Sequence, residues 1–209
     1  MENKKLIIFD LWQTLVDAKM LPSSLVNSLP LPRPDPLVFT ESLSQSDLFL
    51  KDIGTEDGIA QLLVLLGYKN DVHTIRVFSR MWEDMLRSSY LIPGAEEVLQ
   101  QLKRSGYKFC LMTNIDKFAF ENFPFPSLIN RFDHLFLSYK EGVAKPELAC
   151  WKIVSERTSC AYGDMIMIGN SMKDDITPAT ALGIDHIHIG QQGDFKEVYD
   201  KLMIPPCIN

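Results

Sequence analysis

Several short apolar runs in this sequence end on side chains that can carry out nucleophilic chemistry on an anionic substrate. A carboxylate can attack as a covalent nucleophile, and a hydroxyl can hold an anionic group. A lysine can neutralise the charge that builds up on that group, and oxygen ligands can bind a hard cation such as Mg²⁺. The residues with these properties are Asp10, Thr113, Asn114, Lys145, Asn170, Ser171, Asp174 and Asp175.

The elements that must position these side chains follow from the hydrophobic pattern. Short apolar runs typical of buried parallel strands occur at Leu6–Phe9, Lys108–Met112, His134–Leu137, Met165–Gly169 and His186–Gly190. Helical patterns separate the later runs. One begins after Pro93-Gly94, a second extends from Pro146 to about Arg157, and a third follows Ser171. This alternation predicts an α/β core with a parallel sheet. Since ligands bind at the carboxyl ends of such strands, the polar residues above should face one crevice.

A helical segment interrupts this alternation after the first strand. Leu37–Leu50 and Val72–Tyr90 read as helices, and Thr55 is a candidate cap for another that stops at Gly67. We therefore expect residues 1–16 and 93–209 to form the α/β core and residues 17–92 an inserted helical domain.

Composition and charge exclude several functional classes. The chain has 209 residues, 46% of them hydrophobic and 23% charged, which is typical of a globular protein and not of a disordered one. The net charge of −6 disfavours nucleic-acid binding. We find no signal peptide, no apolar run long enough for a membrane span and no CxxC spacing among the four cysteines. The sequence thus favours a cytoplasmic protein with reduced thiols and no membrane or nucleic-acid partner.

Four segments, in order, resemble the motifs of the haloacid dehalogenase-like hydrolase superfamily. They are FDLWQTL, LMTN, GVAKPE and MIGNSMKDDITPATALGI. The resemblance implies a Rossmann-like α/β core with an inserted helical cap of the first type. It also implies that Asp10 is the nucleophile, that Thr113 binds phosphate, and that Lys145 and Asp175 complete the site. The alternative for Asp10 alone is a capping or solvated carboxylate.

Trp12 departs from the phosphatase pattern. In phosphatase members this position is a second aspartate, which protonates the leaving group and then deprotonates the attacking water. Indole has only an N–H donor and can do neither, and such acid–base help is typically worth ~10²–10⁴ in rate. Dehalogenating members have an aromatic residue here. Trp12 is therefore a wall of the pocket or a packing residue between core and cap, while its main-chain carbonyl remains available as a metal ligand.

Asn170 is a second departure, since metal-dependent members usually have aspartate here. With Asp10, Asp175 and Lys145, the site carries one net negative charge instead of the family's three, so Mg²⁺ should be held less strongly. Asp174 could restore one charge. Asn114 and Ser171 each have two interpretations. Asn114 could line the pocket or cap a helix, and Ser171 could bind an anion or cap the next helix.

The sequence leaves three functions open. The first is a Mg²⁺-dependent phosphatase that acts on a small phosphorylated metabolite through an aspartyl-phosphate at Asp10, with Mg²⁺ held by Asp10, the Trp12 carbonyl, Asn170 and Asp175. The second is a metal-free dehalogenase, which would need a cation for the substrate carboxylate, and no arginine of the cap stands out for that role. The third is a non-catalytic binding protein. The phosphatase is the reading we prefer, because most of the superfamily are phosphatases. The sequence does not predict the substrate or the oligomeric state.

Overall fold

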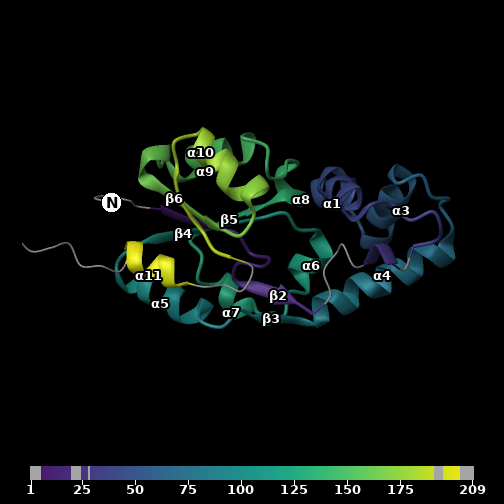
Figure 1. The fold of residues 1–209 in the computed structure, drawn as a ribbon, viewed down its shortest axis with the longest axis horizontal. Coiled ribbons are helices and arrows are strands. Elements are labelled where there is room, and N and C mark those ends of the chain that lie inside the picture. The colour runs from purple at the N-terminus through teal and green to yellow at the C-terminus, as the bar shows by residue number, and fades with distance from the viewer. Residues whose placement is uncertain (1–5, 20–24, 28, 191–194, 203–209) are drawn as a thin grey trace, which may run out of the picture.

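A five-stranded parallel sheet lies at the centre of one part of the molecule, and a group of helices forms a second part beside it (Figure 1). The structure is a computed structural model that describes residues 6–19, 25–27, 29–190 and 195–202. The sheet order is β5-β4-β1-β6-β7. The strands are β1 (Leu6–Phe9), β4 (Lys108–Thr113), β5 (His134–Leu137), β6 (Met165–Gly169) and β7 (Asp185–His188).

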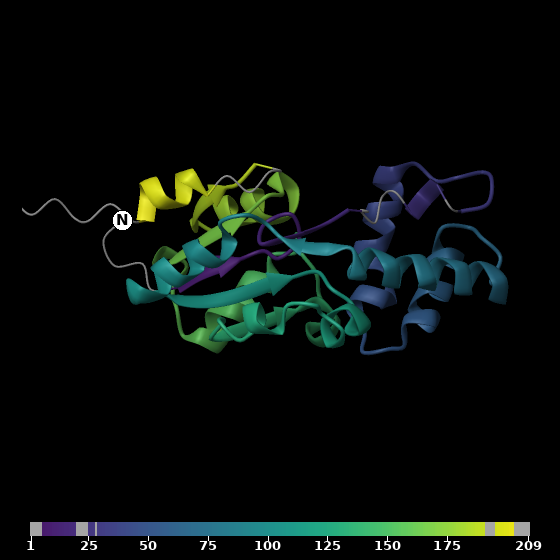
Figure 2. The same cartoon turned by 90° about the horizontal axis from the view of Figure 1, so that it is seen from below.

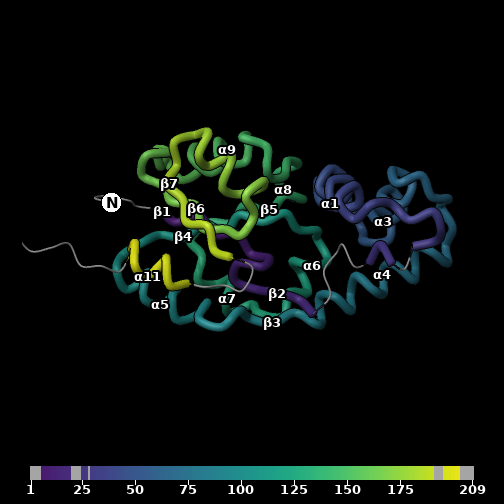
Figure 3. Tube along the Cα trace, viewed as in Figure 1, coloured from purple at the N-terminus to yellow at the C-terminus, as the bar shows by residue number. Residues whose placement is uncertain are grey.

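Helices cover both faces of the sheet, so its strands are buried on both sides (Figure 3). Side chains alternate along a strand, so Ile7 and Phe9 belong to the core cluster that includes residues of α5 (Ala95–Arg104) and α11 (Lys196–Leu202). Leu6 and Ile8 belong to the opposite cluster. That cluster includes residues of α9 (Ala149–Thr158) and α10 (Thr177–Ala181). The continuous apolar run of β1 is explained by this double burial.

The register places the candidate site at one edge of the sheet. Phe9 pairs with Leu111 on one side and with Ile168 on the other. The main-chain N–H of Asp10 continues this ladder by donating to the Ile168 carbonyl at 3.0 Å. Asp10 therefore leaves the sheet between the ends of β4 and β6, where the polar residues of the second and fourth segments begin.

Within the described residues, the second part contains four α-helices with a core of their own. They are α1 (Pro36–Gln45), α2 (Asp47–Leu50), α3 (Thr55–Leu65) and α4 (Val72–Arg87). Their buried cluster includes Phe39, Leu62, Phe78 and Trp82. A two-stranded antiparallel ribbon of β2 (Val16–Ala18) and β3 (Ser89–Leu91) runs between the two parts (Figure 2). None of the helices in the described ranges is long and apolar enough to cross a membrane.

Two expectations about these helices were wrong. The expected helix Leu37–Leu50 is two helices, because Ser46 adopts an extended backbone and its Oγ bonds to the Leu43 carbonyl at 2.7 Å. Thr55 does not cap α3; it is the first helical residue, after Gly54, which makes no side-chain cap.

Element boundaries differed in further places: β4 extends one residue beyond the expected Lys108–Met112, and β7 spans Asp185–His188 instead of the expected His186–Gly190. The expected helix Val72–Tyr90 ends at Arg87, because Tyr90 pairs with Asp17 in the ribbon. The helix expected from Pro146 begins at Ala149. The expected long loop after β4 contains two short helices, α6 (Lys117–Glu121) and α7 (Pro126–Ile129). A further short helix, α8 (Ser138–Glu141), follows β5.

Candidate active site

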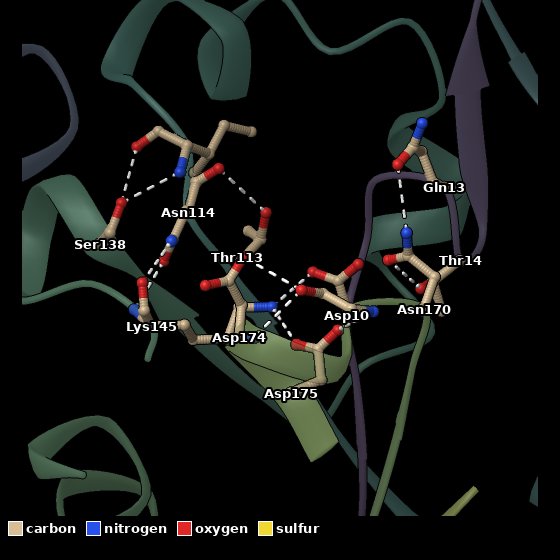
Figure 4. A network of polar contacts seen from close by, with 12 residues as sticks. Asp10, Gln13, Thr14, Thr113, Asn114, Ser138, Lys145, Asn170, Asp174 and Asp175 are labelled. Carbon is tan, nitrogen blue, oxygen red and sulfur yellow. Dashed lines mark hydrogen bonds and ion pairs between the residues drawn. The ribbon is translucent and has the colours of Figure 1, made fainter. Parts of the chain in front are cut away.

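Lys145 joins two buried carboxylates at the end of the sheet. Its Nζ lies 2.6 Å from Oδ1 of Asp10 and 2.6 Å from Oδ1 of Asp175. The side chains of Lys145, Asp10 and Asp175 are only 4%, 8% and 1% exposed. Figure 4 shows both carboxylates turned toward the ammonium group. The three residues come from separate segments, so the fold brings the predicted nucleophile, lysine and fourth-segment aspartate into one cluster.

Burial dominates the protonation of this cluster. Loss of water raises the pKa of the Asp10 carboxyl to about 6; Lys145 opposes the rise and the neighbouring charge of Asp175 adds to it. Burial also works to lower the pKa of Lys145, but the two carboxylates outweigh it and the net shift is upward. Lys145 therefore stays a cation, and the cluster keeps one net negative charge when both carboxyls are ionised.

Asn114 fixes the main chain at Lys145. Its Nδ2 donates to the Lys145 carbonyl and its Oδ1 accepts from the Lys145 N–H, each at 2.9 Å. Thr113, the last residue of β4, is fully buried, and its Oγ1 has only a long 3.5 Å contact to the Asn114 carbonyl. The Thr113 hydroxyl is thus free to turn toward another acceptor, while Asn114 acts mainly by positioning the lysine.

The fourth segment folds around its own aspartates. A π-helical turn spans Met172–Ile176, and the Ser171 hydroxyl caps it by accepting from the Asp174 N–H at 3.0 Å. The Ser171 N–H donates to Oδ2 of Asp175 at 3.0 Å. A Cβ at Gly169 would overlap that same oxygen, so only glycine leaves room for the Asp175 carboxylate. Of the two interpretations of Ser171, capping is the one with a visible contact.

Gln13 is a site residue that sequence reasoning missed. Its backbone has φ of 59°, a left-handed conformation that is uncommon for a residue with a side chain. Its Oε1 accepts from Nδ2 of Asn170 at 3.1 Å, and Oδ1 of Asn170 accepts a longer 3.3 Å bond from the Thr14 hydroxyl. These contacts, drawn in Figure 4, hold the Asn170 amide in a defined orientation. In the sequence, only the position of this long amide side chain between Trp12 and Thr14 could have indicated that Gln13 belongs to the site.

A cavity of about 270 Å³ lies between the helical part and the sheet part. Its residues come from the first segment, from α1, α2 and α4, from the end of β4 and from the π-helical turn. Trp12 lines it and also packs edge-on against Phe123, with ring centroids 6.2 Å apart. Trp12 is therefore both a cavity wall and a packing residue. Asp174 and Asn114 also line the cavity, so it adjoins the cluster around Lys145.

Three further cavity residues were not anticipated from the sequence. Trp82 of α4 donates from Nε1 to Oδ2 of Asp116 at 3.0 Å, which joins the helical part to the sheet part. Asp116 is also the N-cap of α6, and burial raises the pKa of its carboxyl. Asp17, in the ribbon, accepts from the Tyr90 hydroxyl at 3.2 Å. In the sequence, Trp82 was part of a packing stripe and the two aspartates stood outside any motif.

The oxygen atoms at the site are of the type that binds Mg²⁺, but they carry less negative charge than the family's usual ligands. Asp10 and Asp175 offer carboxylate oxygens, Asn170 an amide oxygen and Trp12 a main-chain carbonyl, and hard cations prefer such ligands. One oxygen of each carboxylate already contacts Lys145, and the second oxygen of Asp175 accepts from Ser171. Within the described part of the chain, no three His, Cys, Asp or Glu side chains are grouped as for a metal. A magnesium site here would rely on neutral oxygens more than on charge.

One curated relative matches part of this chain. The chain is 23% identical over 123 residues to a ribulose-1,5-bisphosphate 5-phosphatase from Halopiger xanaduensis, a match that covers 57% of this chain and 52% of that protein. The chain thus aligns with about half the length of this curated relative.

Solved structures show the same fold at low sequence identity. A haloacid dehalogenase-like hydrolase from Porphyromonas gingivalis has a TM-score of 0.71 at 16% identity, covering 97% of this chain and 99% of that one. A family enzyme from Bacteroides thetaiotaomicron in complex with magnesium has a TM-score of 0.69 at 19% identity, covering 96% and 100%. A family model described as haloacid dehalogenase-like hydrolase matches residues 4–183. This chain therefore belongs to the haloacid dehalogenase-like hydrolases and carries the helical cap that its sequence predicts.

Proposed function

We propose that this protein is a Mg²⁺-dependent phosphatase that hydrolyses a small phosphorylated metabolite through an aspartyl-phosphate at Asp10. The observation that carries the proposal is the buried contact of Lys145 with both Asp10 and Asp175. Burying an ion pair costs desolvation free energy that the attraction between its charges often does not repay, so such a cluster indicates a functional site more than a stabilising contact. A phosphoryl group bound beside Asp10 would be a charged partner for Lys145.

The chemistry assigned to the side chains is a two-step transfer. In the first step, a carboxylate oxygen of Asp10 forms a bond to phosphorus, the bond from phosphorus to the ester oxygen breaks, and the alcohol leaves after taking up a proton. In the second step, water attacks phosphorus, the bond to Asp10 breaks, and inorganic phosphate is released with the carboxylate restored. Lys145 and the Thr113 hydroxyl would hold the phosphoryl oxygens during both steps.

Mg²⁺ would be held by Asp10, the Trp12 carbonyl, Asn170 and Asp175, and would supply positive charge to the phosphoryl oxygens. Gln13 supports this assignment, because its contact with Asn170 holds that amide in one orientation. The family enzyme from Bacteroides thetaiotaomicron crystallised with magnesium is consistent with the same use of the metal.

Proton transfer to the leaving alcohol is the step for which this site is least equipped. Trp12 replaces the acid/base aspartate, so the leaving alcohol must take its proton from water or from the substrate itself. We expect good leaving groups to react much faster than alkyl alcohols for this reason. The same substitution supports the second candidate, a protein that binds a phosphorylated ligand without turning it over.

A dehalogenase function has less support. A haloacid substrate would need a cation for its carboxylate, and no Lys, Arg or His in the described part of the chain lines the cavity. The bisphosphate substrate in the name of the Halopiger relative meets the same obstacle, since its second phosphate would also need a positive partner. We therefore do not extend that substrate to this chain.

The test is hydrolysis of an aryl phosphate, with Mg²⁺ and with a chelator, by the wild-type protein and by Asp10→Asn. An aryl leaving group needs little acid assistance, so the absent aspartate should matter least. Asp57→Asn, which changes an exposed carboxylate of α3, is the matched control and should behave as wild type. Turnover that requires both Mg²⁺ and Asp10 would support the phosphatase. Turnover no greater than that of Asp10→Asn would overturn it and favour the binding protein.

A further inference from the structure

The cavity beside the nucleophile has an unusual charge for a site that takes a phosphate ester. Its acidic residues are Asp17, Asp116 and Asp174, and none of the three forms an ion pair with another described residue. The four arginines of the helical part do not line the cavity either. Lys145 therefore supplies the positive charge at the phosphate end of the site, and the charged residues described in the adjoining cavity are all acidic.

Aromatic and aliphatic side chains make up much of the remaining wall. Trp12, Phe49 and Trp82 line the cavity, with Leu43 and Met85 beside them. The Phe49 and Trp82 rings lie 6.0 Å apart at an angle of 59°, so they form two differently oriented surfaces. The indole N–H of Trp82 is taken up by Asp116, which leaves its ring as an apolar wall. Aromatic faces beside carboxylates attract organic cations.

The volume of the cavity limits the size of the group that can occupy it. Small-molecule sites are commonly about 300–1,000 Å³, and this cavity of about 270 Å³ is at the lower limit. A short amine fits within this volume. Burial raises the pKa of the Asp116 carboxyl, and a cation in the cavity would favour its ionised form.

We propose that the substrate is a phosphate monoester of a small amino alcohol, whose ammonium group occupies the cavity formed by Trp12, Phe49, Trp82, Asp17 and Asp174. The inference rests on the proposed phosphatase function and names its substrate class. The phosphate would lie at Asp10 and Lys145, and the positive nitrogen would lie a few bonds away against the acidic wall. The ester oxygen would then be at the junction of the cluster and the cavity.

The test is a series of phosphate esters that are matched in shape and differ in charge. The 2-(trimethylammonio)ethyl ester is compared with its neutral isostere, the 3,3-dimethylbutyl ester, and with the anionic 2-carboxyethyl ester. We expect kcat/KM to be roughly tenfold higher for the cationic ester than for the neutral one, with the anionic ester the poorest. Equal values for the cationic and neutral esters, or a preference for the anionic one, would overturn the proposal.

Asp17→Asn is the matched variant for this test. It removes the charge of Asp17 and keeps one of the two oxygens that accept from the Ala18 N–H and from the Tyr90 hydroxyl. We expect the cationic preference to fall at least threefold in Asp17→Asn and to be unchanged in Asp57→Asn. An unchanged preference in Asp17→Asn would overturn the role given to this carboxylate.

Binding separates this inference from the proposed function. If the aryl phosphate is hydrolysed but the cationic preference is absent, the inference fails and the phosphatase stands. If no ester is hydrolysed, binding of the trimethylammonioethyl alcohol and of neutral 3,3-dimethylbutanol is measured by tryptophan fluorescence. Two of the three tryptophans line the cavity and the third, Trp151, lies in the core on one face of the sheet, so the signal reports on this site. Tighter binding of the cation would support the inference; equal or no binding would overturn it.

Discussion

The ammonium group of Lys145 lies 2.6 Å from the carboxylate of Asp10 in a site where neither side chain is more than 8% exposed. Asp175 contacts the same nitrogen from another segment. A buried lysine thus neutralises one of two carboxylates that would otherwise repel each other. The stability and the chemistry of the site both depend on this contact.

Lys145→Met should destabilise the protein and abolish turnover. Removing one partner of a buried ion pair typically costs about 3–5 kcal/mol, because the remaining charge is left without compensation. Urea unfolding without Mg²⁺, together with aryl phosphate hydrolysis, measures both effects. An unfolding free energy equal to that of wild type would show that the two carboxylates do not depend on Lys145.

The cost of Lys145→Met should depend on pH. Without the lysine, the pKa of Asp10 in the folded state rises further above its unfolded value, so the folded variant holds a proton more tightly than the unfolded chain. Its stability is then greatest at low pH and falls as pH rises through the raised pKa of Asp10. We expect the deficit relative to wild type to be smaller at pH 5 than at pH 7. Unfolding curves at the two pH values test this, and a constant deficit would contradict it.

Trp12→Asp should increase the hydrolysis of alkyl phosphates. The new carboxylate can donate a proton to the leaving alcohol, a contribution typically worth ~10²–10⁴ in rate. A gain of at least tenfold is expected for an alkyl ester and a smaller one for an aryl ester. Trp12→Asn is the control, since it opens the same space without an acid. Equal gains in both variants would mean that space, and not proton transfer, limits the rate.

Gly169→Ala should inactivate the enzyme. The added methyl group would overlap Oδ2 of Asp175, and that carboxylate cannot shift without losing its contacts with Lys145 and Ser171. Overpacking of this kind typically costs about 1–3 kcal/mol in stability as well. Gly190→Ala is the control, because no described residue has an atom within 4 Å of the added methyl group. Wild-type activity in Gly169→Ala would show that Asp175 can move without consequence.

Trp82→Phe should loosen the attachment of the cap to the core. The change keeps an aromatic ring but removes the N–H that donates to Asp116 at 3.0 Å. A hydrogen bond to a charged group is typically worth about 1.5–3 kcal/mol. A double-mutant cycle with Asp116→Asn, measured by urea unfolding, isolates the contact, and additive effects would show that the two residues are not coupled.

The chemical core of this protein could be predicted from sequence because each part of it follows a local pattern. β1, β5 and β6 have the expected bounds, since short apolar runs bounded by polar residues are the signature of strands buried on both faces. Asp10, Thr113, Lys145 and Asp175 stand at strand ends or in the turns after them. Parallel strands bring their carboxyl ends to one edge, so sequence order alone predicted their convergence.

Other features depended on contacts between distant residues. Tyr90 reads as helical, yet it pairs with Asp17, seventy-three positions earlier in the chain, and joins a strand. Trp82 belongs to an amphipathic stripe, and only the packing of cap on core gives its N–H a partner in Asp116.

By itself, therefore, the sequence determined the family, the parallel sheet and the set of reactive side chains, because periodicity and motif order are local properties. Only the tertiary structure decided that Gln13 holds Asn170 and that three aspartates surround one aromatic cavity. The physical reason is that these relationships join residues from the two parts of the molecule or from opposite ends of the chain. Their contact depends on how the cap and the sheet pack together, which no single stretch of sequence encodes.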